Sequence, residues 1–183
     1  RQMCIRDRSA TSAISSSVIS GGENGIFIVM LPSYCSNYAS LEYLETLYME
    51  AITHPDIRIL SIATRPDCLS EKILDLLENL NRIKPVWVEL GLQTIHPESA
   101  RYIRRGYPLE VFDTAVHELK RRNLTVIVHV ILFLPGETHE MMLETIDYLN
   151  HSDIDGIKLQ LLHILEGTDL AVEYQKFLSD PAY

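Results

Sequence analysis

The sequence predicts an α/β protein built on a parallel β-sheet, and three observations carry this prediction. Five short apolar runs recur from Gly25 onward. Segments of roughly 10 to 15 residues with helical spacing of their apolar side chains separate these runs. The runs lack the polar–apolar alternation of a half-exposed strand, so both of their faces are expected to be buried. Such strands are typically parallel and joined by helical crossovers.

Each apolar run is bounded by turn residues and followed by a helical pattern. The predicted strands are residues 26–31, 57–62, 86–90, 126–132 and 157–162. Ser40 and Ser70 are suited to begin the first two helices, because a serine hydroxyl can cap the free N–H groups of a helix start. Pro97 opens a third helical segment at a favoured position. Further helices are predicted over 109–122, 138–149 and 168–177.

Two architectures satisfy this alternation, an open doubly wound sheet and a barrel or partial barrel. The glycine-rich G-x-G-x-x-G turn of a dinucleotide-binding sheet is absent after the first strand, which favours the barrel. Residues 1–24 are rich in Ser and Arg without periodicity, and we expect a disordered or foreign N-terminal flank there. Residues 25–183 form one predicted domain whose end carries no closing signal, so we expect a fragment.

Composition narrows the function classes. The chain has 183 residues, 46% of them hydrophobic and 22% charged, with a net charge of −9. This acidic balance does not support a broad grip on nucleic acid, although a local basic patch stays open. No apolar run approaches the roughly 20 residues that cross a bilayer, and no secretory signal is evident. We therefore expect a cytoplasmic protein without a membrane partner.

The three cysteines do not form a ligand set. Cys4, Cys35 and Cys68 lie far apart in the sequence. Disulfide frameworks and metal sites usually show closely spaced cysteines, so incidental or buried thiols are expected here. The seven histidines also show neither H-x-H nor H-E-x-x-H spacing, which disfavours a metal-dependent hydrolase. No metal ligand is predicted within this chain.

Polar residues follow the predicted strands where a fold alone would need only a turn. In a parallel barrel, the carboxyl ends of the strands converge on one mouth, where reactive groups gather. Glu89, Gly91 and Gln93 share strand parity and are expected to point into the barrel. Structural alternatives stay open: Glu89 paired with an arginine, Gln93 capping the next helix, and His129 as a satisfied core histidine.

Five ordered motifs carry a family resemblance. They are TRPDCL, WVELGLQTIHPES, IRRGYP, HVILFLPGETHEMMLET and DGIKLQLLHILEGT. Their succession closely resembles the YhcC-like branch of radical S-adenosylmethionine (SAM) proteins. That branch is related to the elongator-type catalytic subunit and to oxygen-independent coproporphyrinogen oxidases. The resemblance covers residues 25–177, nearly all of the organised chain.

The resemblance implies a partial (β/α)6 barrel, of which this chain supplies five strand–helix units, strands 2 to 6, without the first strand. It further implies SAM and a [4Fe–4S] cluster as cofactors. The full-length enzyme would reductively cleave SAM at the cluster, and the resulting 5′-deoxyadenosyl radical would act on an unknown substrate. An electron donor such as flavodoxin or ferredoxin is the implied partner.

The family pattern also implies a set of cofactor-binding residues. Gln93 and Arg105 match positions that contact the ribose and carboxylate region of SAM, and Ile131 matches an apolar contact to adenine. Arg65 and Glu89 match polar positions at the mouth. The last strand would supply an edge of the adenine site through Leu162 and His163. On position alone, Arg105 could instead be a solvated helix end.

Two departures from the family pattern bear on function. The family's three cluster-binding cysteines lie in a Cys-x-x-x-Cys-x-x-Cys loop after the first strand, and this sequence has no such loop. We therefore expect the chain to be inactive alone. Phe133 also stands where the family usually has Gly, which could crowd the adenine site. The alternative is an α/β module that binds a nucleotide or a protein without a cluster or radical chemistry.

Overall fold

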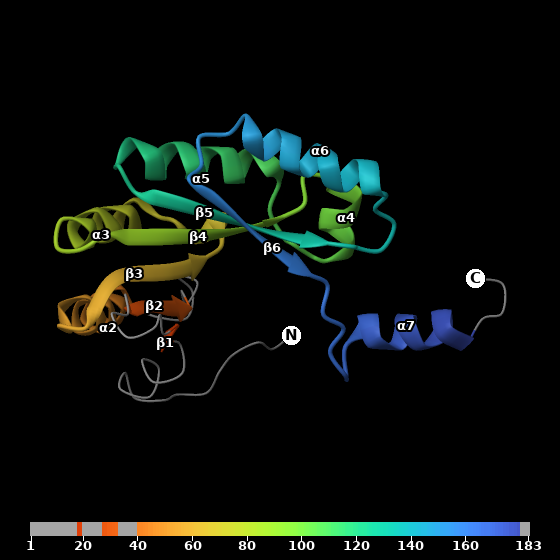
Figure 1. The fold of residues 1–183 in the computed structure, drawn as a ribbon, viewed down its shortest axis with the longest axis horizontal. Helices are drawn as coiled ribbons and strands as arrows, with labels where there is room; N and C mark the ends of the chain where they lie inside the picture. The colour runs from red at the N-terminus through yellow and green to blue at the C-terminus, as the bar shows by residue number, and fades with distance from the viewer. Residues whose placement is uncertain (1–17, 20–26, 33–39, 180–183) are drawn as a thin grey trace.

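A single six-stranded sheet organises the molecule in a computed structural model that describes residues 18–19, 27–32 and 40–179. The strands follow chain order, β1-β2-β3-β4-β5-β6. Five of them, from β2 to β6, are parallel neighbours. Their bounds are Phe27–Pro32, Ile57–Thr64, Val86–Gln93, Thr125–Leu132 and Gly156–Leu161. The sheet curls into a half-barrel, which confirms the predicted fold class (Figure 1).

The first strand is short and differs in direction. β1, Val18–Ile19, pairs antiparallel with β2. These two residues lie within the predicted disordered or foreign flank of residues 1–24, and they form ladder pairs with Val29 and Ile28. The rest of the predicted 1–24 flank lies outside the described residues.

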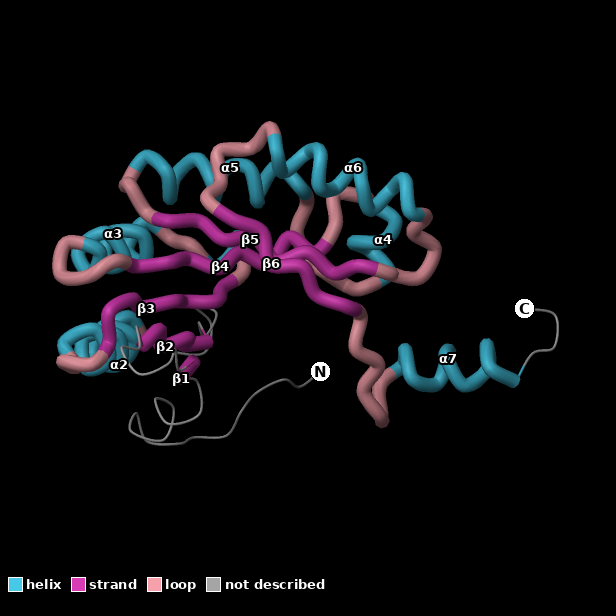
Figure 2. The backbone as a smooth tube through the Cα atoms, in the orientation of Figure 1, coloured by secondary structure: helices cyan, strands magenta, loops and turns pink. Residues whose placement is uncertain are grey.

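Helices follow the strands as the periodicity predicts. Their bounds are α2 Leu41–Thr53, α3 Glu71–Asn81, α4 Pro97–Tyr102, α5 Leu109–Arg121, α6 His139–Asn150 and α7 Asp169–Ser179. A short 3-10 turn, η1 Pro66–Cys68, follows β3. Figure 2 shows α7 extending away from the sheet beyond β6. None of the described helices is long and apolar enough to cross a membrane.

Capping side chains explain where two of these helices begin. The Ser40 hydroxyl accepts a hydrogen bond from the Tyr43 backbone N–H (3.2 Å), and Thr138 does the same for Met141 (3.3 Å). Ser70 also stands at the N-cap of α3, but its side chain makes no capping hydrogen bond. Asn123 adopts a left-handed φ of 56° just after α5, as expected of an asparagine that ends a helix.

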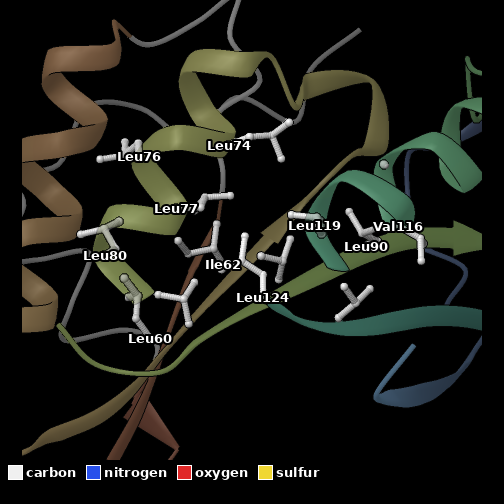
Figure 3. Packing of buried hydrophobic residues seen from close by; sticks show 14 of the residues in the cluster. Leu60, Ile62, Leu74, Leu76, Leu77, Leu80, Leu90, Val116, Leu119 and Leu124 are labelled. Carbon is white, nitrogen blue, oxygen red and sulfur yellow. The ribbon is translucent and has the colours of Figure 1, made fainter. Parts of the chain in front are cut away.

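The hydrophobic core lies between the helices and one face of the sheet. Every second residue of the central strands points to this side, including Leu60, Ile62 and Leu90, which are at most 1% exposed. Leucines of α3 and α5 pack against them, as Figure 3 shows for Leu77 and Leu119. We call this helix-covered side the outer face and the opposite side the inner face. Burial of the outer face fixes which residues the inner face presents.

Candidate functional site

The predicted site residues come from the carboxyl ends of β3 to β6 and from the loops that follow. Because these strands are parallel, their carboxyl ends lie at the same edge of the sheet (Figure 1). This edge is the mouth of the half-barrel, where enzymes of barrel type place their reactive groups. Three groups of side chains occupy it: a polar network around Glu89, a bulged strand end at Gln93, and an apolar cavity.

Glu89 is the centre of the polar network on the inner face. Ser61 Oγ donates to its Oε1 at 2.5 Å, and Lys158 Nζ donates to its Oε2 at 3.2 Å. His129 Nε2 also bonds Oε2. These partners come from β3, β5 and β6, so the network crosses the sheet. The predicted alternative of an arginine partner is wrong, since a lysine and a histidine take that place.

The charge of Glu89 is strongly stabilised. Its carboxylate is 5% exposed, and burial by itself would raise its pKa. Hydrogen bonds from His129 and Ser61, together with the positive charge of Lys158, outweigh burial and lower the pKa to about 2. Glu89 is therefore ionised at neutral pH. His129 is bonded to it, as the core-histidine alternative expects.

The end of β4 is bulged at Gly91 to Gln93, where the pairing with β5 shifts register. Gln93 has a φ of 71°, a left-handed conformation that non-glycine residues adopt rarely. The alternation that would have placed Gln93 beside Glu89 therefore stops after Gly91. A Cβ on Gly91 would come within 2.9 Å of Gln93 Nε2, so a larger residue would displace the amide.

Gln93 carries an unsatisfied polar atom. Its Oε1 is buried, and it has no hydrogen-bond partner among the residues that the structure describes. It does not cap the following helix, whose N-cap is His96. Leaving a buried acceptor without a donor costs about 1–3 kcal/mol. Such an atom in a native protein indicates a ligand or water as its missing partner.

Arg105 is buried beneath this bulge rather than exposed at a helix end. It is 8% exposed, and its Nη1 donates to the carbonyls of Leu92 (3.2 Å) and Thr94 (2.6 Å). Its Nε donates to the Tyr107 carbonyl at 3.1 Å. Within the described part of the chain, its Nη2 makes no hydrogen bond. The neighbouring Arg104 is the exposed arginine.

Tyr107 joins two of the predicted arginines and was not found from the sequence. The Arg105 guanidinium lies 4.8 Å from the centre of its ring, and that of Arg65 lies at 5.4 Å. The Tyr107 hydroxyl donates to the Gly91 carbonyl, and burial raises its pKa to about 12. Arg65 also binds Asp67 through two hydrogen bonds of 2.9 and 2.6 Å. Arg65, Gln93 and Arg105 are thus brought together.

A side-chain hydrogen bond also connects the ends of β4 and β5. Thr94, fully buried, donates from Oγ1 to Glu137 Oε1 at 2.5 Å. Glu137 belongs to the Pro-Gly-Glu turn after β5, so this bond ties the end of β4 to that of β5. The roles of Thr94 and Glu137 could not be predicted from local sequence patterns. The two residues are far apart in the sequence and come into contact only in the fold.

The apolar cavity contains two of the remaining predicted residues. Ile131 and Leu162 line a cavity of about 280 Å³ together with residues of α4 and α7. A hydrogen bond of 2.6 Å between Arg104 and Asp169 joins two of its walls. His163 is exposed and does not line this cavity. Phe133 does not line it either: its φ is 62° and it is 63% exposed.

Comparison with known proteins identifies the family. The sequence model of the Radical SAM superfamily matches residues 17–149. The chain belongs to the radical SAM superfamily. It is 36% identical over 165 residues to the uncharacterized protein YtqA of Bacillus subtilis, covering 88% of this chain and 51% of that protein. It is 34% identical over 150 residues to YhcC of Escherichia coli, covering 81% and 48%. The chain spans about half the length of these curated relatives.

Solved radical SAM structures share this fold. The archaeal Elp3 of Methanocaldococcus infernus superposes with a TM-score of 0.66 at 24% identity, covering 82% of this chain and 40% of that one. Coproporphyrinogen III oxidase of Escherichia coli gives a TM-score of 0.61 at 17% identity, covering 83% and 40%. At these identities the likeness concerns the fold, and it agrees with the half-barrel.

Membership of the radical SAM superfamily implies two cofactors, a [4Fe–4S] cluster and SAM. The residues that the structure describes do not suit both cofactors equally well. No group of three or more His, Cys, Asp or Glu side chains suited to a metal occurs in residues 18–19, 27–32 and 40–179. Cys68 is buried, and Cys4 and Cys35 lie outside these ranges. A [4Fe–4S] cluster needs thiolate ligands, so the described residues do not fit it. The orphaned Gln93 oxygen and the apolar cavity, both at the carboxyl ends of the strands, do suit parts of a nucleoside.

Proposed function

We propose that the mouth of this half-barrel binds the nucleoside and amino-acid parts of SAM, as part of a radical SAM enzyme. The observation that carries the proposal is the buried, unsatisfied Oε1 of Gln93. A ribose hydroxyl is a hydrogen-bond donor, which this acceptor lacks among the described residues. The missing Cβ of Gly91 leaves room for the Gln93 amide in this position.

Two further features suit the rest of the ligand. Arg105 Nη2 keeps its N–H groups for a carboxylate, since the three hydrogen bonds of this side chain to described residues use Nε and Nη1. Ile131 and Leu162 offer an apolar wall to a flat adenine ring. These assignments follow the order of groups along SAM, from carboxylate through ribose to adenine.

In the full-length enzyme, SAM bound beside a [4Fe–4S] cluster would supply a 5′-deoxyadenosyl radical for hydrogen abstraction from a substrate. A one-electron donor such as flavodoxin or ferredoxin would be needed. The residues described here would bind and orient SAM, and exclude water from it. They would take no part in holding the cluster.

Binding of SAM and of S-adenosylhomocysteine to the 183-residue chain tests the proposal. Trp87 is the single tryptophan, and it lies on β4, so its fluorescence reports on this strand. We expect saturable binding of both ligands to the wild type. Gln93→Ala should weaken binding about tenfold, which corresponds to one hydrogen bond of about 1.4 kcal/mol. Unchanged affinity in this variant would contradict the proposal.

A control variant separates this effect from general loss of structure. Asn150→Ala removes an exposed amide at the end of α6, near the amino end of β6 and far along the strands from the mouth. It should leave both affinities within twofold. Circular dichroism of each variant checks that the fold is kept.

A nucleotide-binding module without radical chemistry is the second candidate, favoured by the absence of cluster ligands among the described residues. The same titration separates the two. Under the SAM proposal, removing the amino-acid part of the ligand loses the contact to Arg105, so adenosine should bind more weakly than S-adenosylhomocysteine. Equal affinities, or tighter binding of ATP, would favour the second candidate.

A further inference from the structure

We propose that Lys158, held by Glu89 beside His129, forms a site on the inner face of the half-barrel that binds an anionic group, a carboxylate or a phosphate. That this group belongs to the substrate rests on the proposed function, which places the cofactor at the mouth above the inner face. The binding chemistry itself rests on the network alone.

The register of the sheet brings the two basic residues together. Gly91, His129 and Lys158 are consecutive partners across β4, β5 and β6. In a parallel sheet, such partners share a face. Gly91 has no side chain, and the amide of Gln93 lies over it, because a Cβ there would come within 2.9 Å of Gln93 Nε2. The next inner pair toward the mouth on β5 and β6 is Ile131 with Gln160, and Ile131 lines the apolar cavity.

The unused N–H donors of this network lie on Lys158, because His129 uses its Nε2 on Glu89. Glu89 already accepts bonds from Ser61, His129 and Lys158. An ammonium group has three N–H donors, and Lys158 uses one of them on Glu89. Among the described residues, Lys158 has no second hydrogen-bond partner. The inner face therefore offers N–H groups, and the matching ligand group is an acceptor.

The exposed fractions of the side chains distinguish Lys158, which would bind the anion, from His129 and Glu89, which hold it in place. The Lys158 side chain is 39% exposed, whereas those of His129 and Glu89 are 15% and 6% exposed. Here the carboxylate is buried and satisfied, while the ammonium stays accessible from inside the half-barrel. The ionised Glu89, whose pKa is lowered to about 2, keeps His129 and Lys158 in place.

Charge favours an anion over a neutral acceptor. The cluster contains one carboxylate, one ammonium and one imidazole. Glu89 already accepts three hydrogen bonds, and the unused N–H groups of the cluster lie on the Lys158 ammonium, so this unused capacity suits an anion. Hydrogen bonds between an ammonium and a carboxylate or phosphate are about twice as strong as those between neutral groups.

Titration of the 183-residue chain with inorganic phosphate and, separately, with acetate tests this site. The experiment is run at constant ionic strength and followed by Trp87 fluorescence, since Trp87 lies on the inner side of β4, in register with Ser61. We expect a saturable response to at least one anion. Lys158→Met should weaken that response at least tenfold, and His129→Gln should weaken it less. Lys158→Arg, which keeps the charge and donors, should retain it within threefold.

Matched controls exclude a general charge effect. Lys72→Met and His117→Gln remove an exposed lysine on α3 and an exposed histidine on α5. Both should leave the anion response unchanged. An equal loss in Lys72→Met and Lys158→Met would mean nonspecific screening and would overturn the proposal. So would an unchanged response in Lys158→Met.

The outcome is separable from that of the SAM proposal. S-adenosylhomocysteine affinity is measured in the same variants and should change less than twofold in Lys158→Met. If the wild type binds no SAM but loses its anion response in Lys158→Met, the anion site stands and the proposed function fails. If SAM binds and the anion response is insensitive to Lys158, the proposed function stands and this inference fails.

Discussion

The two faces of the same sheet differ in composition, and the difference separates folding from function. On the outer face, Val88, Leu90 and Val128 are fully buried beneath the helices. On the inner face, Glu89 and His129 stand at alternate positions of the same two strands, in a polar network. The outer face could be exchanged for other aliphatic residues of similar volume. The inner face holds a polar network that packing of the helices on the outer face does not require.

This comparison also explains why β4 and β5 look uniformly apolar with single polar interruptions. A strand covered on both faces needs no alternation, so a charged residue within it must be paired. Glu89 is paired three times, which makes its burial tolerable. An isolated charge in a buried strand is therefore a useful signal for a network that other strands complete.

The largest expected effect is a decrease in the free energy of unfolding when a side chain on the outer face is truncated. Leu90→Ala removes a fully buried side chain packed against the helices and should cost about 3 kcal/mol. Ile127→Ala, on the inner face beside Glu89, should cost only about 1 kcal/mol, because its side chain is already partly exposed. Urea unfolding at pH 7 measures both. Equal losses would show that the inner face is packed as tightly as the outer one.

A pH-dependent loss should follow from Glu89. Its pKa falls from an ordinary value of 4.5 in the unfolded chain to about 2 in the folded protein, which corresponds to about 3 kcal/mol. Because the folded pKa is the lower one, this stability is present above pH 4.5 and is lost as the pH falls toward 2. His129, Ser61 and Lys158 face the carboxylate and supply the stabilisation.

Comparison with Glu89→Gln isolates this contribution from those of other carboxylates. Chemical denaturation is measured at several pH values, from neutral pH down to the lowest pH at which the protein stays folded. The wild type should lose its stability advantage over Glu89→Gln progressively as the pH falls. A constant difference across this range would mean that Glu89 titrates normally and that the network is not strongly coupled.

The sequence predicted the sheet well because strand and helix patterns are local. All five parallel strands are present, although β3 and β4 extend to Thr64 and Gln93, beyond the predicted ends at 62 and 90. Each extension ends in a polar residue, Thr64 or Gln93, so an apolar run alone could not show where the strand stops. Glu89 stood out because a carboxylate within an apolar run is conspicuous.

The parts of the site that sequence reasoning missed depend on distant contacts. Tyr107 gains its role from Gly91 and from two arginines, and none of these contacts leaves a periodic trace. Arg105 looked like a helix end because Gly106 follows it, yet its guanidinium turns back under β4. His163 matched the family position but lies outside the cavity that contains Leu162.

The two adjacent arginines at the mouth allow a comparison within one loop. Arg105→Met leaves the carbonyls of Leu92 and Thr94 without their donor and should cost about 2 kcal/mol. Arg104→Met removes an exposed ion pair with Asp169 and should cost about 0.5 kcal/mol. Thermal unfolding of both variants checks the difference. Equal costs would contradict a bulge held in place by Arg105.

The smallest expected effect is a gain in stability where the alternation of faces ends. Phe133 follows β5 with a left-handed φ of 62° and is 63% exposed, so its ring contributes little packing while its backbone is strained. Phe133→Gly should stabilise the fold by about 0.5 to 1 kcal/mol, after allowance for the greater freedom of glycine in the unfolded chain.

Gly136→Ala in the same turn is the matched opposite change. Gly136 has a φ of 84°, and an added Cβ would meet no atom within 4 Å, so the variant reports backbone strain alone. It should lose about 1 kcal/mol. Opposite signs for the two variants would show that the turn after β5 is conformationally strained at Phe133 and relaxed at Gly136. A loss of stability in Phe133→Gly would instead show that the exposed ring makes a contact that outweighs the strain of its backbone.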